Sequence, residues 1–349
     1  MNKTIFISVL ALAAAISCTK SDIVDTKFEN EAIGFETYLG RDAQTKASET
    51  TTTSLAEFGV YGFYTATIQY DPTNTKHAAA NLMDNVKVTK SGNVWSYSPA
   101  RYWNHEEDLY TFFAYSPYSV DKVGGAPVIE YTVKDDPASQ EDVVYSVNAR
   151  NVSKKTCTFT DGTYVPFTFK HALARLSVKA NAVMYDKQGA IATDQTTVYD
   201  NRFTITNISI KGKFCKTGSM NLSAETPVWT STPSTTDITY DLTGTVEQLL
   251  DGSLYDFSAN TAKGYLMMMP TQFSEANPAV LSVTYYVTYA GEKSKPITKT
   301  VNVPTNFQQG KAYTINLTLQ RDSNNAITFT VKEVSGWETG STQTPTING

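Results

Sequence analysis

The chain has 349 residues, of which 41% are hydrophobic, 12% aromatic and 18% charged. So many aromatic residues beside so few charges are typical of a folded chain and argue against a disordered one. The formal net charge of −5 excludes the strongly basic surface that nucleic-acid-binding proteins usually carry. Because one domain usually holds roughly 100–200 residues, the length favours about two domains.

The first 17 residues predict a signal peptide for export. An apolar run extends from Ile5 to Ile16, and at about a dozen residues it is too short for a membrane-spanning helix of about 20. The sequence Ala-Ile-Ser-Cys that ends at Cys18 is similar to a bacterial lipobox, in which the cysteine becomes the lipidated first residue after cleavage. Residues 18–30 are then a polar spacer, and the lipid is the protein's contact with the outer membrane. An ordinary signal peptide with an incidental cysteine is the alternative.

Beyond the spacer, short runs rich in Val, Ile, Thr, Tyr and Phe alternate with turn residues, which predicts antiparallel strands. In chain order these runs are 32–40, 58–70, 93–103, 108–118, 127–134, 142–147, 164–180, 203–214, 228–232, 238–244, 264–273, 279–291, 296–303, 312–319 and 326–334. Helical periodicity is brief, at 54–58, 78–85 and 171–176. The stretch 181–201 has the most turn residues. We therefore expect an all-β protein with two tandem β-sandwich domains, residues 31–182 and 183–349.

Residues that could support catalysis are few. His77, His105 and His171 are expected to be structural, and the acidic run Glu106-Glu107-Asp108 is expected to be a solvated loop. The chain has none of the common nucleophile, phosphate-binding or zinc motifs. We therefore predict no enzyme activity, no metal site and no cofactor.

Two sets of residues allow more than one interpretation. Cys157 and Cys215 could form a disulfide during export or remain two buried thiols. An aromatic cluster could form an exposed platform for stacking sugars, which would indicate a glycan-binding surface lipoprotein, or it could pack in the core. This cluster consists of Trp95, Tyr97, Tyr102 and Trp103.

The order of several runs over nearly the entire chain resembles the fimbrillins, the lipoprotein-precursor pilins of certain anaerobic bacteria. The runs are AIGFETY, FGVYGFY, WSYSPARYWN, YTFFAYSPY, FTFKHALARLSVK, GYLMMMPTQF and GKAYTINLTL. The resemblance implies transthyretin-like sandwiches and a fimbrial subunit at the cell surface, whose partners are other pilin subunits. It also implies cleavage by a trypsin-like protease, which frees the first strand and opens a groove for a strand of a neighbouring subunit. The matching cleavage sites here are Arg41 and Lys46, and the sequence does not decide between them.

Residues 31–46 are accordingly expected to be a removable strand followed by a tether. At period two, Ile33, Phe35, Thr37 and Leu39 share one face. Burying the three large apolar side chains of this face would contribute of order 5–9 kcal/mol, at roughly 1.5–3 kcal/mol each.

The segment 326–334 has the alternation expected of a donor strand. Ile327, Phe329 and Val331 repeat the spacing of the predicted removable strand. The same segment could instead be the last strand of the second domain.

Overall fold

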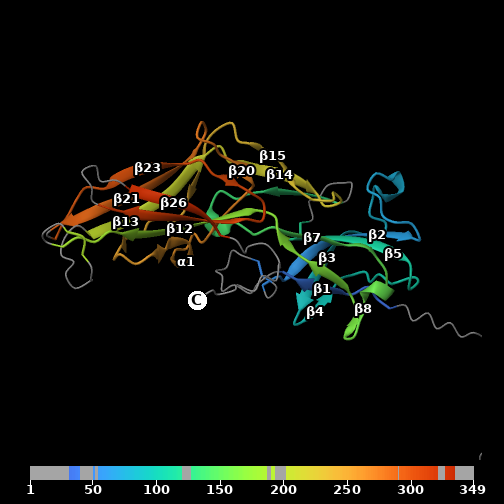
Figure 1. Cartoon of the computed structure of the whole chain (residues 1–349). Helices are drawn as coiled ribbons and strands as arrows, with labels where there is room; N and C mark the ends of the chain where they lie inside the picture. Colours follow the sequence, from blue (N-terminus) through green and yellow to red (C-terminus); the bar gives the residue numbers. More distant parts are fainter. Residues whose placement is uncertain are drawn as a thin grey trace, which may run out of the picture.

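The computed structural model describes residues 31–39, 50–51, 54–119, 127–186, 190–192, 202–289, 291–320 and 327–334. Within these ranges the chain is mainly strand, which confirms the all-β class, and the only α-helix that they contain is the single turn α1 (Phe257–Asn260). No helix in the described part of the chain combines the length and apolarity needed to cross a membrane. The predicted signal peptide, Cys18, Arg41 and Lys46 lie outside the described residues. The molecule is elongated, with the strands of the first half at one end and most strands of the second half at the other (Figure 1).

A six-stranded antiparallel sheet forms the N-terminal end. Its strand order is β11 (Lys170–His171), β7 (Val144–Val152), β5 (Leu109–Ser116), β2 (Glu57–Ala66), β3 (Met83–Ser91) and β4 (Val94–Ser96). The two central strands, β2 and β5, are buried along almost their whole length, because both faces of this sheet are covered. Continuous apolar runs such as DLYTFFAYS follow from that double coverage.

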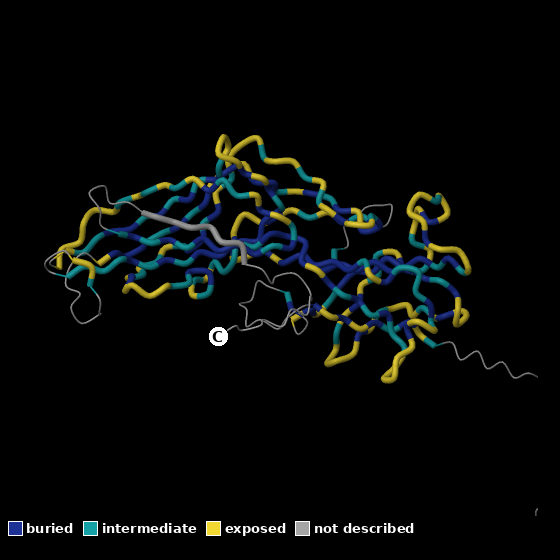
Figure 2. Tube along the Cα trace, in the orientation of Figure 1, coloured by how far each residue is buried: buried dark blue, intermediate teal, exposed yellow. Residues whose placement is uncertain are grey.

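A two-stranded parallel ribbon covers one face of this sheet. It consists of β1 (Phe35–Tyr38) and β10 (Val165–Thr168). Side chains from the ribbon and from the sheet form one apolar cluster, which is rich in phenylalanine. The opposite face of the sheet contributes side chains such as Tyr61 and Phe113 to a second, larger cluster that extends into the other end of the molecule. Figure 2 shows buried residues running continuously along the long axis.

Two sheets of the C-terminal end contribute to this larger cluster. The first has the order β18 (Tyr255–Asp256), β12 (Ala174–Ala182), β25 (Ala312–Leu319) and β26 (Ile327–Val334), with β19 (Leu266–Met268) also on β12. The second has the order β16 (Ile238–Asp241), β13 (Arg202–Gly212), β21 (Ala279–Tyr289) and β22 (Glu292–Lys293), with β17 (Gln248–Leu249) on β13 and β23 (Ile297–Val303) on β21. All three residues of β19 are buried.

Strand pairing crosses the predicted boundary near residue 182. The strand β12 precedes this boundary but pairs with β18, β19 and β25, which follow it. The strand β6 (Val128–Thr132) likewise joins β14 (Cys215–Asn221) and β15 (Trp229–Pro233) in a three-stranded sheet. The chain therefore changes sheets between His171 and Ala174, and the division into two domains at 182 stays a prediction.

The brief helical patterns form no helix. The run 171–176 contributes to β11 and β12, while 54–58 leads into β2 and 78–85 leads into β3. Each run is too short to be a stable helix by itself, so sheet pairing decides its conformation. The remaining elements are the pairs β8 (Thr158–Phe159) with β9 (Gly162–Thr163) and β20 (Thr271–Gln272) with β24 (Asn306–Phe307), and 3-10 turns at Thr75–His77, Pro137–Ser139 and Lys155–Cys157.

Candidate functional site: the slot of the first strand

The first strand lies between two backbone edges. On one side, β1 pairs in parallel with β10, in the register Phe35 with Val165 and Thr37 with Phe167. On the other side, the Ile33 amide donates to the Arg101 carbonyl over 2.8 Å, and an antiparallel bridge joins Ala32 to Tyr102. We call the space that residues 31–39 fill between these edges the slot. Removal of this segment would leave unpaired backbone groups on both sides of the slot.

The side chains of residues 33–39 alternate between the core and solvent. Ile33 is 1% exposed, Phe35 and Thr37 are 6% exposed and Leu39 is 2% exposed, whereas Tyr38 is 52% exposed. This alternation confirms the two faces that period two predicts. The four residues of one face are therefore buried in the core, and the opposite face of the segment is exposed to solvent.

Aromatic rings surround the side chain of Phe35. Its ring stacks on Phe167, with centroids 5.3 Å apart, and meets Phe58 and Phe112 edge-on at 5.9 and 6.0 Å. The Tyr97 ring lies 5.6 Å away, and the Tyr97 hydroxyl donates to the Ile33 carbonyl over 2.8 Å. These contacts give the slot a deep aromatic pocket for one large side chain.

The proposed sugar-stacking cluster does not form a platform. Trp95 and Trp103 are buried in the core beneath the slot, at 9% and 3% exposure. Tyr97 holds the first strand, and Tyr102 alone of the four is exposed, at 46%. Core packing is therefore the correct interpretation for Trp95 and Trp103, which both belong to the phenylalanine-rich cluster.

Thr37 is an imperfect occupant of the slot. Its side chain is 94% buried, yet no hydrogen-bond partner for its Oγ1 is found among the described residues. A buried hydroxyl without a partner is costly, because it loses its hydrogen bonds to water and gains none. The sequence carried no signal for this feature, since threonine is common in strands.

The outer edge of β10 is held by one side chain instead of a strand. Asn148, on β7, donates from Nδ2 to the Pro166 carbonyl over 2.7 Å and accepts at Oδ1 from the Thr168 amide over 2.9 Å. Its Oδ1 also accepts from the Ser146 hydroxyl. The carboxamide thus replaces the peptide group of a neighbouring strand, and Pro166 fits because Asn148 bonds its carbonyl and not the N–H that proline lacks. Sequence analysis did not identify Asn148.

Both ends of the predicted tether lie at the same part of the fold. The Phe169 amide donates to the Tyr38 carbonyl over 2.8 Å, just before the tether begins. After it, the Thr50 amide donates to Asp142 Oδ2 over 3.0 Å, and the same oxygen lies 2.8 Å from Nδ1 of His171. Residues 40–49 therefore leave and re-enter the described structure close to residues 169–171. A cut between Leu39 and Thr50 would free the first strand while the following segment stays attached.

An ion pair closes the beginning of the slot. Lys154 Nζ lies 3.0 Å from Glu31 Oε2. The hydrogen bond from Lys154 lowers the pKa of the Glu31 carboxyl below its ordinary value of 4.5. The pair is partly exposed, so its contribution is small.

The histidines and acids of the sequence lie in separate places. His171 is buried against Asp142, and His77 is buried too, with its ring stacked 5.4 Å from the Tyr70 ring. Asp108 accepts a hydrogen bond from the Tyr64 hydroxyl over 2.8 Å. Within the described ranges, no group of three or more His, Cys, Asp or Glu side chains could hold a metal ion.

Cys157 and Cys215 are both free and buried, so they form no disulfide. They belong to different apolar clusters. Burial raises the pKa of the Cys157 thiol to about 11, which makes it a poor nucleophile at neutral pH. The interpretation as two buried thiols is therefore the correct one.

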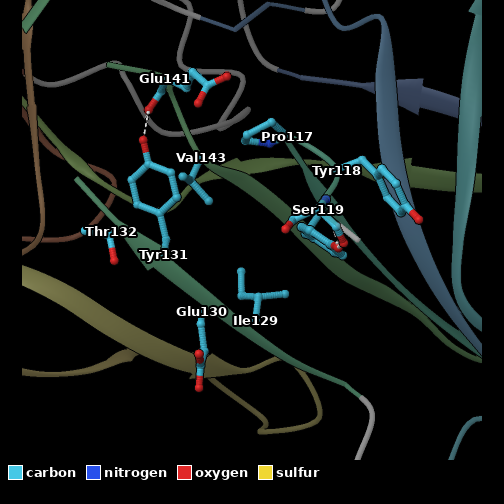
Figure 3. A pocket seen from close by; sticks show the side chains of 10 residues that line it. Pro117, Tyr118, Ser119, Ile129, Glu130, Tyr131, Thr132, Glu141 and Val143 are labelled. Carbon is cyan, nitrogen blue, oxygen red and sulfur yellow. Dashed lines mark hydrogen bonds between the residues drawn. The ribbon is translucent and has the colours of Figure 1, made fainter. Parts of the chain in front are cut away.

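A cavity of about 310 Å³ lies between the end of β5 and β6 (Figure 3). Burial raises the pKa of both Tyr115 and Tyr131, which line it, to about 12, so both hydroxyls are donors at neutral pH. The Tyr131 hydroxyl donates to the Glu141 carbonyl over 3.1 Å, and the Tyr115 hydroxyl donates to Asn85 Oδ1 over 2.7 Å. Both hydroxyls that line this cavity therefore already donate hydrogen bonds to other groups of the protein.

The predicted donor residues lie away from the slot. β26 pairs antiparallel with β25, in the register Ile327 with Leu319 and Val331 with Ile315. It is the edge strand of its sheet, at the end of the molecule opposite β1 (Figure 1).

Comparisons with known proteins give the family. Over 187 residues the chain is 25% identical to the fimbrium subunit Fim1C of Phocaeicola vulgatus, an alignment that covers 48% of this chain and 48% of that protein, so it spans about half the length of the curated relative. A fimbrial protein from Bacteroides vulgatus has a similar fold, with a TM-score of 0.64 and 19% identity over 88% of this chain and 100% of that chain. A candidate cell adhesion protein from Bacteroides ovatus has a TM-score of 0.53 and 18% identity over 89% and 99%. Residues 45–337 match the Fimbrillin-like family, and because this match covers well over half of the chain, the protein belongs to that family.

Proposed function

We propose that this protein is a structural and adhesive pilin subunit of a surface fimbria, and that residues 31–39 are a temporary occupant of the slot. Family membership supports the fimbrial role. The observation that carries the release of the first strand is its position: one apolar face is buried between two backbone edges, and the tether that follows it begins and ends near residues 169–171. The subunit has no catalytic step in this proposal.

The energetics favour pairing with another chain after the strand leaves. The vacated slot exposes the pockets of three large apolar side chains, Ile33, Phe35 and Leu39, together with unpaired backbone groups of β10 and of residues 101–103. An extended segment of a second subunit restores the main-chain hydrogen bonds, and in the segment 326–334 the side chains Ile327 and Phe329 match Ile33 and Phe35. Cleavage thereby converts a closed precursor into a subunit that polymerises.

Export as a lipoprotein precedes this step in the proposal. The signal peptide 1–17, lipidation at Cys18 and the spacer 18–30 bring the precursor to the outer membrane. A trypsin-like protease then cuts after Arg41 or Lys46. The other partners are further pilin subunits, and the lipid anchor of the precursor is its membrane contact.

The donor in this proposal is the segment 326–334 of a second subunit. Its edge position on β25 supports the role, because β26 can leave without breaking the interior of its sheet. The same pairing also suits the alternative, in which this segment is only the last strand of its own sheet. The variant Phe329→Asp separates the two, since unchanged polymerisation in this variant excludes the segment as donor.

Limited trypsin digestion of the purified precursor tests the proposal as a whole. We expect cleavage after Arg41 or Lys46, identified by mass spectrometry of the new N-terminus, followed by a ladder of oligomers on a gel. The double variant Arg41→Ala with Lys46→Ala should stay monomeric under the same treatment. A correctly cut subunit that remains a monomer would contradict the proposed function.

A further inference from the structure

We propose that Thr37 makes the first strand the weaker occupant of its own slot, and that the slot prefers a strand of a second copy of this chain with an apolar β-branched residue at this position. The inference rests on the proposed function for its biological meaning. The cost of burying the Thr37 hydroxyl can be measured in the uncut precursor, whether or not the subunits assemble.

Three other buried threonines have hydrogen-bond partners for their hydroxyls. Thr111 Oγ1 accepts from the Asn151 amide over 2.9 Å, and Thr243 Oγ1 accepts from the Ile208 amide over the same distance. Thr271 Oγ1 donates to the Met269 carbonyl over 2.8 Å and accepts from the Cys215 amide over 3.0 Å. The fold therefore provides partners for these three hydroxyls, but provides none for Oγ1 of Thr37 among the described residues.

The surroundings of Thr37 favour a methyl group over a hydroxyl. Its neighbours on the same face of the strand are Phe35 and Leu39, and its partner in register on β10 is Phe167. All three belong to the phenylalanine-rich core cluster. Valine has nearly the same shape as threonine and needs no hydrogen-bond partner, so it would fill this position without the cost of desolvating a hydroxyl.

A second copy of the chain contains a segment of this description. In the donor segment, Val331 follows Phe329 by two residues, as Thr37 follows Phe35 in the first strand. The hydroxyl that the resident strand buries is thus absent from the replacement. At the position of Thr37, this difference favours replacement of the first strand by the donor segment.

Pairing with β10 does not distinguish the two occupants. β1 is four residues long and runs parallel to β10, and a donor that places Phe329 and Val331 at the positions of Phe35 and Thr37 runs in the same direction.

Two positions have the opposite preference. A Cβ added at Gly34 would meet the Thr163 carbonyl oxygen at 3.3 Å, so the residue Thr328 of the donor requires a shift of a few tenths of an ångström there in the same register. In that register Glu333 of the donor falls at the position of Leu39, which is 2% exposed, so its carboxylate must be neutralised or turned out of the slot. Among the four buried positions of the first strand, Thr37 is the one at which the donor gains.

Unfolding of the uncut precursor provides the first test. We expect Thr37→Val to raise the melting temperature and Thr37→Ser, which keeps the hydroxyl and loses a methyl group, to lower it. The matched pair Tyr38→Thr and Tyr38→Val makes the same threonine-to-valine comparison on the exposed face of β1, and these two variants should melt alike. A melting temperature of Thr37→Val that is unchanged or lower overturns the inference, whether or not the subunits assemble.

Binding to the cut subunit provides the second test. Labelled peptides with the sequence of residues 31–40, with and without Thr37→Val, are titrated onto the trypsin-cleaved protein from which the first strand has been removed. We expect the valine peptide to bind roughly tenfold more tightly, as removal of one unpaired buried hydroxyl implies. Peptides that bind equally overturn the inference while leaving the proposed function intact. If the wild-type subunit neither ladders nor binds any peptide while Thr37→Val still stabilises the precursor, the proposed function fails and the preference of the slot stands.

Discussion

The ring of Phe35 is stacked on the ring of Phe167, with centroids 5.3 Å apart and planes inclined by 14°. One residue belongs to the strand that we propose is released, and the other to the strand that stays. Both side chains are almost fully buried. The same surface of Phe167 that Phe35 covers in the precursor is therefore the floor on which a replacing strand would pack.

Truncation of Phe35 should destabilise the precursor strongly. Phe35→Ala removes a buried ring that contacts four other aromatic rings, and we expect a loss of about 3–5 kcal/mol in the free energy of unfolding. Urea denaturation measures the change. Tyr38→Ala, on the exposed face of the same strand, is the control, and its free energy of unfolding should stay within about 0.5 kcal/mol of that of the unaltered protein. Similar losses in the two variants would contradict the burial of this strand.

Asn148 should determine how firmly β10 is held. Asn148→Ala removes both hydrogen bonds to the outer edge of β10, each worth about 0.5–1.5 kcal/mol. We expect faster hydrogen exchange at the Thr168 amide, measured by NMR, and weaker binding of the strand peptide to the cut subunit. In Asn148→Asp, an ionised carboxylate faces the Pro166 carbonyl and cannot donate to it, whereas the protonated acid can. The ionised carboxylate still accepts from the Thr168 amide, so protection at Thr168 should be lost in Asn148→Ala and kept in Asn148→Asp. Identical exchange in Asn148→Ala and the unaltered protein would refute the role.

The two cysteines should be unreactive in the native protein. Cys157 and Cys215 are buried and free, and the raised pKa of Cys157, about 11, leaves it protonated at neutral pH. Iodoacetamide labelling followed by mass spectrometry should modify neither thiol until the chain is unfolded. Because burial raises this pKa above the ordinary value of 9.0, the stability that the neutral thiol contributes is complete below 9.0 and is lost as pH rises through about 11. Rapid native labelling of either cysteine would contradict its burial.

Buried tyrosines should make the fold sensitive to alkaline pH. Burial raises the pKa values of Tyr115, Tyr131 and Tyr240 from 10.0 to about 12. In the unfolded chain these groups lose their protons first, so the free energy of unfolding falls once pH exceeds 10 and continues to fall until about 12. Tyrosinate absorbance and circular dichroism followed together should report one cooperative transition. Titration of all tyrosines near pH 10 before unfolding would contradict the prediction.

The ion pair at the beginning of the slot should weaken in acid. The lowered pKa of Glu31 means that its contribution is present above 4.5 and is lost as pH falls through the lower, folded value. Lys154→Gln should lower the free energy of unfolding by about 0.2–1 kcal/mol at neutral pH and leave it unchanged in strong acid. Lys155→Gln, whose ion pair with Glu107 is much more exposed, is the control and should have little effect at either pH. Equal effects of the two variants would remove any special role for Lys154.

The alternation of residues 33–39 was predictable from the sequence, because period two assigns Ile33, Phe35, Thr37 and Leu39 to one face of any strand that they form. The all-β class was predictable for the same reason, since the runs and their turn residues are local signals. The conformation of 171–176 was not, because its side chains suit either a short helix or a strand and the pairing of β12 with β25 decides between them.

The amino-acid sequence alone determined the all-β class and which face of the first strand is apolar, because both follow from residues that are neighbours in the chain. Only the tertiary structure decided that β1 lies parallel to β10, that Trp95 and Trp103 are core residues instead of a platform, and that Asn148 occupies the place of a strand. It also decided that the Thr37 hydroxyl is left without a partner among the described residues. These features depend on which distant segments meet, and a hydrogen bond or a cavity between distant segments has no signature in either segment by itself.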